Sequence, residues 1–98
     1  MTDLKGKVVW ITGASTGIGR ALVTTYLDRG CFVVASSRSI SETHFTAVEL
    51  NSERLTLLPG DVSLERDNRR LVYHIIEQFG RVDLAILNAG SNGYVTVD

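Results

Sequence analysis

The sequence has little of several features that would assign it to whole classes of protein. Its single cysteine, Cys31, excludes an internal disulfide, because a disulfide needs two thiols. The longest uninterrupted apolar runs are about five residues long, far below the ~20 residues that a membrane-spanning helix requires. A net charge of −1 gives no general attraction to nucleic acid or to an anionic membrane surface. Any binding of an anion must therefore be local.

The amino terminus lacks the features of a secretory signal. Asp3 lies among the first residues, and no long apolar segment follows it. Together with the single cysteine, this predicts a protein of the reducing cytoplasm. The 44% of hydrophobic and 21% of charged residues are typical of a soluble globular protein. The 98 residues suffice for one small domain or for part of a larger one.

Metal-binding and nucleophilic patterns are also missing. His44 and His74 fall in different predicted elements, and neither has metal-ligand spacing to acids or to Cys31. We interpret Cys31, at the entrance of a predicted strand, as a small buried hydrophobe. We do not interpret Ser15 as a nucleophile, because no histidine or acid lies near it in the motif, residues 12–19.

Short apolar runs and helical patterns alternate along the chain. Continuous apolar runs of this length are typical of strands in a parallel sheet that is covered on both faces. They predict four strands, at residues 7–11, 32–36, 55–58 and 84–87. The alternation predicts right-handed strand–helix–strand units in one α/β domain.

Three helices are predicted between these strands. The first covers residues 17–29, and its predicted apolar face is formed by Ile18, Ala21, Leu22, Thr25 and Tyr26. The second covers residues 41–50. The third lies between Ser63, a predicted N-cap, and Gly80, a predicted stop. The tail, residues 91–98, is predicted to be a loop.

The glycine pattern Gly13-x-x-x-Gly17-x-Gly19 separates the first predicted strand from the first helix. Gly13 permits a sharp exit from the strand, Gly17 lets the backbone approach a pyrophosphate, and Gly19 lets the helix pack closely on the sheet. Such a turn presents backbone N–H groups at the positive end of a helix dipole, which favours a phosphate. Because the spacing differs from Gly-x-Gly-x-x-Gly, an ordinary tight turn is the alternative on glycine spacing alone.

Two further motifs follow later strands. Asp61-Val62 comes after the third predicted strand, and Asn88-Ala89-Gly90 comes after the fourth. Together with residues 12–19 and 79–83, they resemble the short-chain dehydrogenase/reductase family over nearly the whole chain. The resemblance implies the N-terminal cofactor-binding half of a Rossmann-type doubly wound sheet with strand order 3-2-1-4, truncated relative to the full family fold. It also implies a nicotinamide dinucleotide partner, bound at the carboxyl ends of the strands.

The resemblance implies a cofactor-binding role for residues of each motif. Those of the glycine turn would line the pyrophosphate and the adenosine ribose: Gly13, Ser15, Thr16, Gly17, Ile18 and Gly19. Asp61 would accept a hydrogen bond from the adenine amino group, and the Val62 backbone would meet the edge of the ring. Asn88, Ala89 and Gly90 would lie beside the nicotinamide ribose, and Asn88 would also tie neighbouring strands together.

The residues after the second strand indicate which nicotinamide cofactor is bound. An acid there would hydrogen-bond the ribose hydroxyls and repel a 2′-phosphate. Ser37 stands where NAD-using relatives tend to carry that acid, and Arg38 follows it. A guanidinium can hold a phosphate through two parallel hydrogen bonds, and the hydroxyls of Ser36, Ser37 and Ser39 can add further donors. We therefore predict NADP in preference to NAD, the alternative being an exposed loop arginine without a ligand.

The acid–base pair of the resembled family, a tyrosine followed four positions later by a lysine, does not occur in this chain. Glycine, glutamate and aspartate stand at that spacing after Tyr26, Tyr73 and Tyr94. A lysine one helical turn away would lower the pKa of the phenol and hold the cofactor ribose. The whole protein would transfer hydride between the nicotinamide and an alcohol or carbonyl carbon, whereas this chain by itself is predicted to be inactive.

Two alternatives stay open. One is a non-catalytic NADP-sensing or regulatory protein of the same fold. The other is a methyltransferase-like nucleotide domain, although such domains usually carry an acid where Ser37 and Arg38 stand. Because the chain is expected to be truncated relative to the full family fold, the fourth predicted strand, 84–87, would be an open edge. We therefore also predict marginal stability and self-association through that edge.

Overall fold

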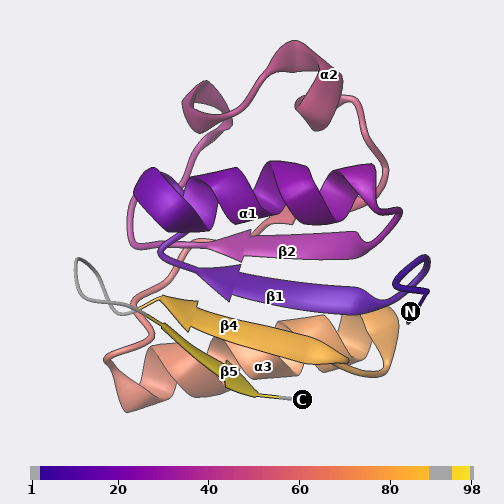
Figure 1. Cartoon of the computed structure of the whole chain (residues 1–98). Helices are drawn as coiled ribbons and strands as arrows, with labels where there is room; N and C mark the ends of the chain where they lie inside the picture. Colours follow the sequence, from indigo (N-terminus) through magenta and orange to yellow (C-terminus); the bar gives the residue numbers. More distant parts are fainter. Residues whose placement is uncertain (1–2, 89–93, 98) are drawn as a thin grey trace.

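The chain folds into a sheet with helices on both faces (Figure 1). The computed structural model describes residues 3–88 and the backbone of residues 94–97. Its elements in chain order are β1 (Val8–Thr12), α1 (Gly17–Asp28), β2 (Phe32–Ser36), η1 (Glu42–His44), α2 (Ala47–Leu50), β3 (Leu55–Leu57), α3 (Glu65–Phe79), β4 (Leu84–Asn88) and β5 (Tyr94–Val97). The strand order is β3-β2-β1-β4-β5, and the first four strands are parallel. The predicted order 3-2-1-4 is confirmed.

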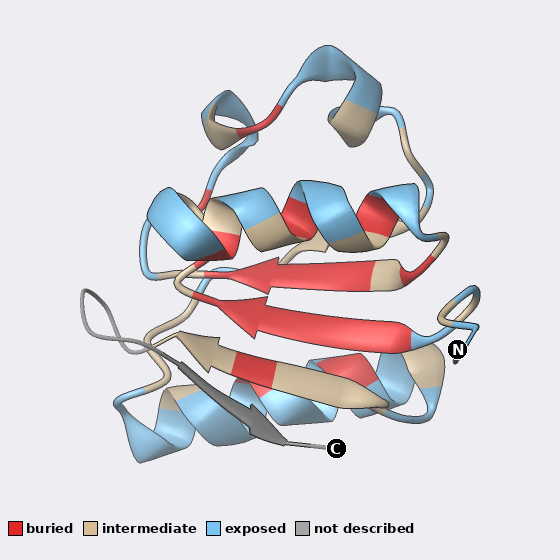
Figure 2. Ribbon diagram, in the orientation of Figure 1, coloured by how far each residue is buried: buried red, intermediate tan, exposed pale blue. Residues whose placement is uncertain are grey.

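The apolar residues of β1 alternate between two cores. Val9 and Ile11 belong to the core beneath α1, whereas Val8 and Trp10 pack on the opposite face with residues of α3. All five residues of β1 are buried (Figure 2). Because helices cover both faces of the sheet, its inner strands are continuously apolar and do not alternate between apolar and polar residues.

The two long helices each bury one stripe. In α3, Leu71 and Ile75 are fully buried, and Gly80 ends the helix in the left-handed conformation with φ 78°. The N-cap of α3 is Leu64 and not Ser63, because the Ser63 hydroxyl donates to Asp61 instead.

The predicted apolar face of α1 is wrong: Ile18, Ala21 and Thr25 are exposed, and Leu22 and Tyr26 are only partly buried. Ile18 is 56% exposed, whereas Gly19, Val23 and Leu27 form the buried stripe. The buried face is set by the close approach of Gly19 to the preceding turn, so the helix is rotated away from the face that hydrophobicity alone favours.

The predicted helix at residues 41–50 is wrong as a single element. It is divided into η1 and α2 by Phe45 and Thr46, whose backbones are extended. Ser41 and Thr46 each begin a helix with a capping box, in partnership with His44 and Glu49 respectively. Each side chain that caps a backbone N–H group thus starts a new short helix rather than continuing one.

The tail is also different from the prediction. Residues 94–97 form β5, which pairs antiparallel with β4 from Asn88↔Tyr94 to Ala85↔Val97. The expectation of an open fourth-strand edge is therefore wrong, since the backbone groups of β4 pair with those of β5. None of the helices in the described part of the chain is both long enough and apolar enough to cross a membrane.

Candidate functional site

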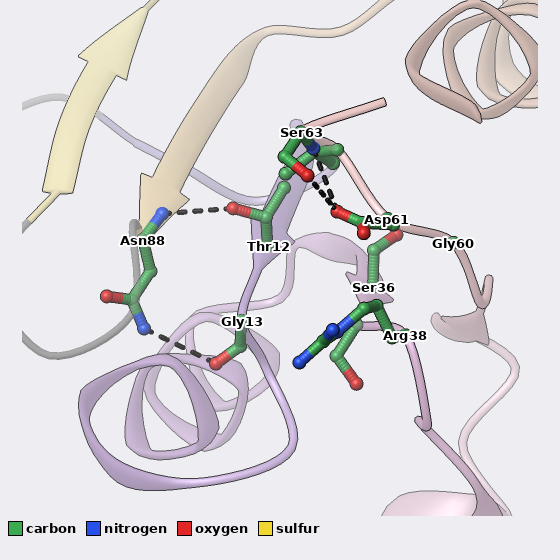
Figure 3. Close-up of a pocket in the computed structure, with 10 residues that line it drawn as sticks. Thr12, Gly13, Ser36, Arg38, Gly60, Asp61, Ser63 and Asn88 are labelled. Atoms are coloured by element: carbon green, nitrogen blue, oxygen red, sulfur yellow. Dashed lines mark hydrogen bonds between the residues drawn. The ribbon is translucent and has the colours of Figure 1, made fainter. Parts of the chain in front are cut away.

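A cleft of about 360 Å³ opens where the parallel strands end (Figure 3). It is lined by residues that follow or terminate β1, β2, β3 and β4: Thr12, Gly13, Ser36, Ser37, Arg38, Gly60, Asp61, Val62, Ser63 and Asn88. Parallel strands bring their carboxyl ends to one edge of the sheet, which explains how residues up to 76 positions apart meet.

Asn88 joins the end of β4 to the end of β1. Its backbone N–H donates to the Thr12 hydroxyl at 3.0 Å, and its side-chain amide donates to the Gly13 carbonyl at 3.3 Å (Figure 3). Gly13 has φ +60°, and a Cβ there would lie 3.0 Å from two atoms of Asn88. The turn after β1 therefore depends on a glycine and on the amide that holds it.

The turn leads into the N-terminus of α1, whose first backbone N–H groups have no acceptor within the helix. The N-cap residue, Thr16, makes no side-chain capping bond in the described part of the chain. Gly17 has φ +60°, and a Cβ on Gly19 would lie 2.2 Å from the Gly13 carbonyl oxygen. The turn thus packs tightly against a helix end that keeps backbone donors and a positive dipole for an anion.

The cleft is positive near the end of β2. Arg38 is exposed and its guanidinium extends into the cleft (Figure 3). Among residues 3–88, none forms a hydrogen bond or ion pair with Arg38. The neighbouring Ser37 accepts a hydrogen bond from the Ser15 hydroxyl at 3.0 Å, so its own hydroxyl hydrogen is left to donate.

Asp61 lies beside these groups, because it follows Gly60, whose backbone N–H donates to the Ser37 carbonyl at 3.0 Å. Its carboxylate accepts hydrogen bonds from the Ser63 hydroxyl at 2.6 Å and from the Ser63 backbone at 3.0 Å. These bonds, and to a smaller extent the charge of Arg38, lower the pKa of Asp61 below its ordinary value. Asp61 is therefore an ionised acceptor at neutral pH.

The predicted site residues divide into three groups. Those that line the cleft are Gly13, Ser37, Arg38, Asp61, Val62 and Asn88. Those of the adjoining turn and helix start do not line it: Ser15, Thr16, Gly17, Ile18 and Gly19. Ala89 and Gly90 lie outside the described residues.

Ser36, a predicted hydroxyl donor, lines the cleft, and its hydroxyl accepts from the Trp10 indole N–H at 3.0 Å, whereas Ser39 does not line it. Three lining residues were not predicted as site residues: Thr12, Gly60 and Ser63. Each immediately adjoins a predicted one, so the signal that could have found them is their position at a strand end. Gly60 lies beneath α3, where a Cβ would come within 2.9 Å of Leu71. Within the described ranges, no three histidine, cysteine, aspartate or glutamate side chains are grouped as a metal site.

Comparison with known proteins agrees with this arrangement. The sequence model of the short chain dehydrogenase family matches residues 7–97. The chain is 43% identical to 11-beta-hydroxysteroid dehydrogenase A of Sesamum indicum, over 90% of this chain and 26% of that protein. It is 39% identical to L-fucose dehydrogenase of Mus musculus, over 92% of this chain and 32% of that protein. The chain thus spans about a third or less of the length of these two relatives.

Solved structures show the same fold. The 3-ketoacyl-(acyl-carrier-protein) reductase from Brucella melitensis, complexed with NADH, superposes with a TM-score of 0.74 and 31% identity, over 84% of this chain and 33% of that one. A short chain dehydrogenase from Bacillus anthracis superposes with a TM-score of 0.72 and 28% identity, over 86% and 35%. Sequence, topology and the cleft at the strand ends agree: this chain belongs to the short chain dehydrogenase family.

Proposed function

We propose that this chain is the NADP(H)-binding part of a short chain dehydrogenase whose whole form transfers hydride between the nicotinamide and an alcohol or carbonyl carbon. The observation that carries the preference for NADP is Arg38, which follows β2, faces the cleft and is unpaired within the described residues. The binding of NADH by a related solved structure supports a nicotinamide cofactor in general.

The residues at the cleft fit the phosphate groups of such a cofactor. The backbone amides at the start of α1, from Gly17 to Gly19, would hold the pyrophosphate. Because Gly13 and Gly19 have no Cβ atoms, the turn can pack closely against Asn88 and the start of α1. Arg38 would hold the 2′-phosphate through its guanidinium, with the Ser37 hydroxyl as a second donor. Two separate anion sites thus match the two anionic parts of NADP.

The remaining roles follow the other strand ends. The ionised carboxylate of Asp61 would accept from the adenine amino group, beside the Val62 backbone. Asn88, followed by Ala89 and Gly90, would lie at the nicotinamide ribose. When bound, the cofactor supplies the hydride, whereas these residues supply placement and electrostatics.

We further propose that the chain alone does not catalyse the reaction, because it has no tyrosine with a lysine four positions later. A non-catalytic NADP-sensing or regulatory role would use the same site and is the alternative. Cytoplasmic location and self-association stay predictions. Self-association through this end of the sheet would involve β5, since β4 is paired.

Replacement of Arg38 tests the proposed cofactor. We expect Arg38→Asp to weaken NADPH binding by at least ~1.5 kcal/mol relative to NADH, the lower value for a hydrogen bond to a charged group. Isothermal titration of both cofactors against both proteins measures this difference. Arg66→Asp, an equal change of charge on α3, is the matched control. An unchanged preference in Arg38→Asp would remove Arg38 from the site.

A further inference from the structure

A polar cluster outside the cleft holds the segment between β2 and β3 against α1. Its centre is Arg20, whose Nε donates to the His44 carbonyl at 2.7 Å and whose guanidinium lies 4.6 Å from the centre of the Phe45 ring. The same guanidinium forms an ion pair with Glu49. We call Arg20, Thr24, His44, Phe45 and Glu49 the Arg20 cluster.

Glu49 is the acceptor that completes this cluster. Besides Arg20, its carboxylate accepts from the Thr24 hydroxyl at 2.6 Å and from the Thr46 backbone at 3.0 Å. Burial acts to raise the pKa of Glu49, but hydrogen bonds from these residues outweigh burial and lower the pKa to about 2. The side chains of Arg20 and Glu49 are only 21% and 11% exposed, so this pair is shielded from water far more than the exposed pair Arg69–Glu65.

The cluster lies at one end of the segment that carries Arg38. At the other end, the Ser36 and Ser37 carbonyls accept backbone hydrogen bonds from Ala14 at 3.1 Å and from Gly60 at 3.0 Å. Between these two attachments Ile40 is buried in the core beneath α1. Arg38 is thus held between the sheet edge and the Arg20 cluster, while its own side chain makes no hydrogen bond or ion pair within residues 3–88.

From this arrangement we propose that Arg20 is a positioning residue for recognition of the 2′-phosphate, because it fixes the segment from which Arg38 reaches the cleft. The inference rests on the proposed function, in which Arg38 binds that phosphate. Arg20 itself does not line the cleft, since its guanidinium is directed to η1 and α2. Its effect on the cofactor therefore passes through the backbone of residues 38–45.

Loss of the cluster has a selective consequence. The segment would sample more conformations, and binding of NADP would have to order it again, which lowers affinity. NAD has no 2′-phosphate and would not use Arg38, so its affinity would change little. The ratio of the two affinities separates a positioning role from a general loss of structure, which would weaken both cofactors together.

The test compares Arg20→Met with Arg69→Met in the 98-residue chain. Both remove an arginine that is paired with a glutamate, but Arg69 lies on α3 and pairs within its own helix. Dissociation constants for NADP⁺ and NAD⁺ are measured by calorimetry at one ionic strength, and circular dichroism verifies the fold. We expect at least a fivefold loss of NADP⁺ affinity in Arg20→Met, less than a twofold change for NAD⁺, and no change of the ratio in Arg69→Met.

A second variant keeps the question answerable where Arg20→Met does not fold. Glu49→Gln retains the contacts of Arg20 with His44 and Phe45 but removes the charge of the acceptor, and we expect it to lower the NADP⁺/NAD⁺ affinity ratio at least twofold. An unchanged ratio in a folded Arg20 or Glu49 variant, with wild-type chain preferring NADP⁺, overturns the positioning role alone. Equal affinity of the wild-type chain for both cofactors instead overturns the proposed NADP preference, and this inference with it.

Discussion

Gly19 is the position where one added methyl group should disturb both the fold and the proposed cofactor site. A Cβ on Gly19 would lie 2.2 Å from the Gly13 carbonyl oxygen and 2.8 Å from the Gly13 carbonyl carbon, whereas real Cβ atoms essentially never come closer than 3.0 Å to another group. The Asn88 amide nitrogen would be 3.0 Å away. This amide donates to the same Gly13 carbonyl. Neither Gly13 nor Asn88 can therefore move without loss of the hydrogen bond that connects the end of β1 to the end of β4.

The expected magnitude follows from this crowding. Overpacking at a site that cannot relax costs ~1–3 kcal/mol, a large fraction of the ~5–15 kcal/mol that stabilises a typical domain. Relief of the clash also moves the start of α1 away from the turn. Loss of one hydrogen bond to a charged pyrophosphate, worth ~1.5–3 kcal/mol, would lower NADP⁺ affinity about tenfold or more.

Two other glycines supply controls for Gly19→Ala. Gly6 has φ +81° and lies away from the cleft, with nothing within 4 Å of an added Cβ. Gly6→Ala therefore measures the cost of the left-handed backbone alone, ~1–2 kcal/mol, and should leave cofactor affinity unchanged. Gly17→Ala, with φ +60° and no crowding, separates backbone strain from steric contact at the site itself.

Urea denaturation and calorimetry with NADP⁺ measure the two effects. A Gly→Ala change within a helix by itself favours the helix. Gly19→Ala should nevertheless lower the free energy of unfolding, because of the crowding with Gly13. A variant as stable as the wild-type chain within ~0.5 kcal/mol, with unchanged NADP⁺ affinity, would refute the argument from close packing.

Two further predictions concern α3 and the Arg20 cluster. Leu71→Ala should cost ~2–5 kcal/mol of unfolding free energy, because Leu71 is fully buried. Val72→Ala, at a neighbouring residue that is 38% exposed, should cost less than ~1 kcal/mol. Equal losses of the two variants in urea denaturation would contradict the assigned core. The lowered pKa of Glu49 means that its stabilising contribution is fully present above the ordinary pKa of 4.5 and is lost as pH falls towards about 2. The stability of Glu49→Gln should therefore depend less steeply on pH between these values, and an unchanged slope of unfolding free energy against pH would show that Glu49 is not held as an ion.

The parallel part of the sheet was predictable because each strand is a short apolar run bounded by turn residues. Trp10 illustrates the strength of that signal. It lies in the first predicted strand and is buried in the core, where its indole N–H donates to the Ser36 hydroxyl at 3.0 Å. The order of the strands was not contained in these runs, but came with the resemblance that the glycine turn, Asp61 and Asn88 carry.

The errors arise where local propensity and tertiary contacts disagree. Thr46 reads as a weak helix residue within a longer helix, yet its side chain caps a new one and its backbone N–H reaches Glu49. The tail was predicted to be a loop, although Val95 and Val97 favour a strand, and the tail pairs with β4 along the side of β4 that faces away from β1. Hydrophobicity selected Ile18 for the buried face of α1, whereas packing selected Gly19, the residue with no side chain.

The availability of Arg38 could not be predicted either, because the pairing of arginines depends on long-range contacts. Arg20 is taken by Glu49, and Arg54 by the carbonyls of Leu27 and Cys31. Within residues 3–88, Arg66 resembles Arg38 in that it is exposed and makes no hydrogen bond or ion pair, but it lies on α3 and outside the cleft. Arg66 is thus an example of the exposed arginine without a ligand that was the alternative for Arg38. Since the two differ mainly in their neighbours, a selective loss of NADPH affinity in Arg38→Asp and not in Arg66→Asp would have to come from the cleft and not from the charge of the chain as a whole.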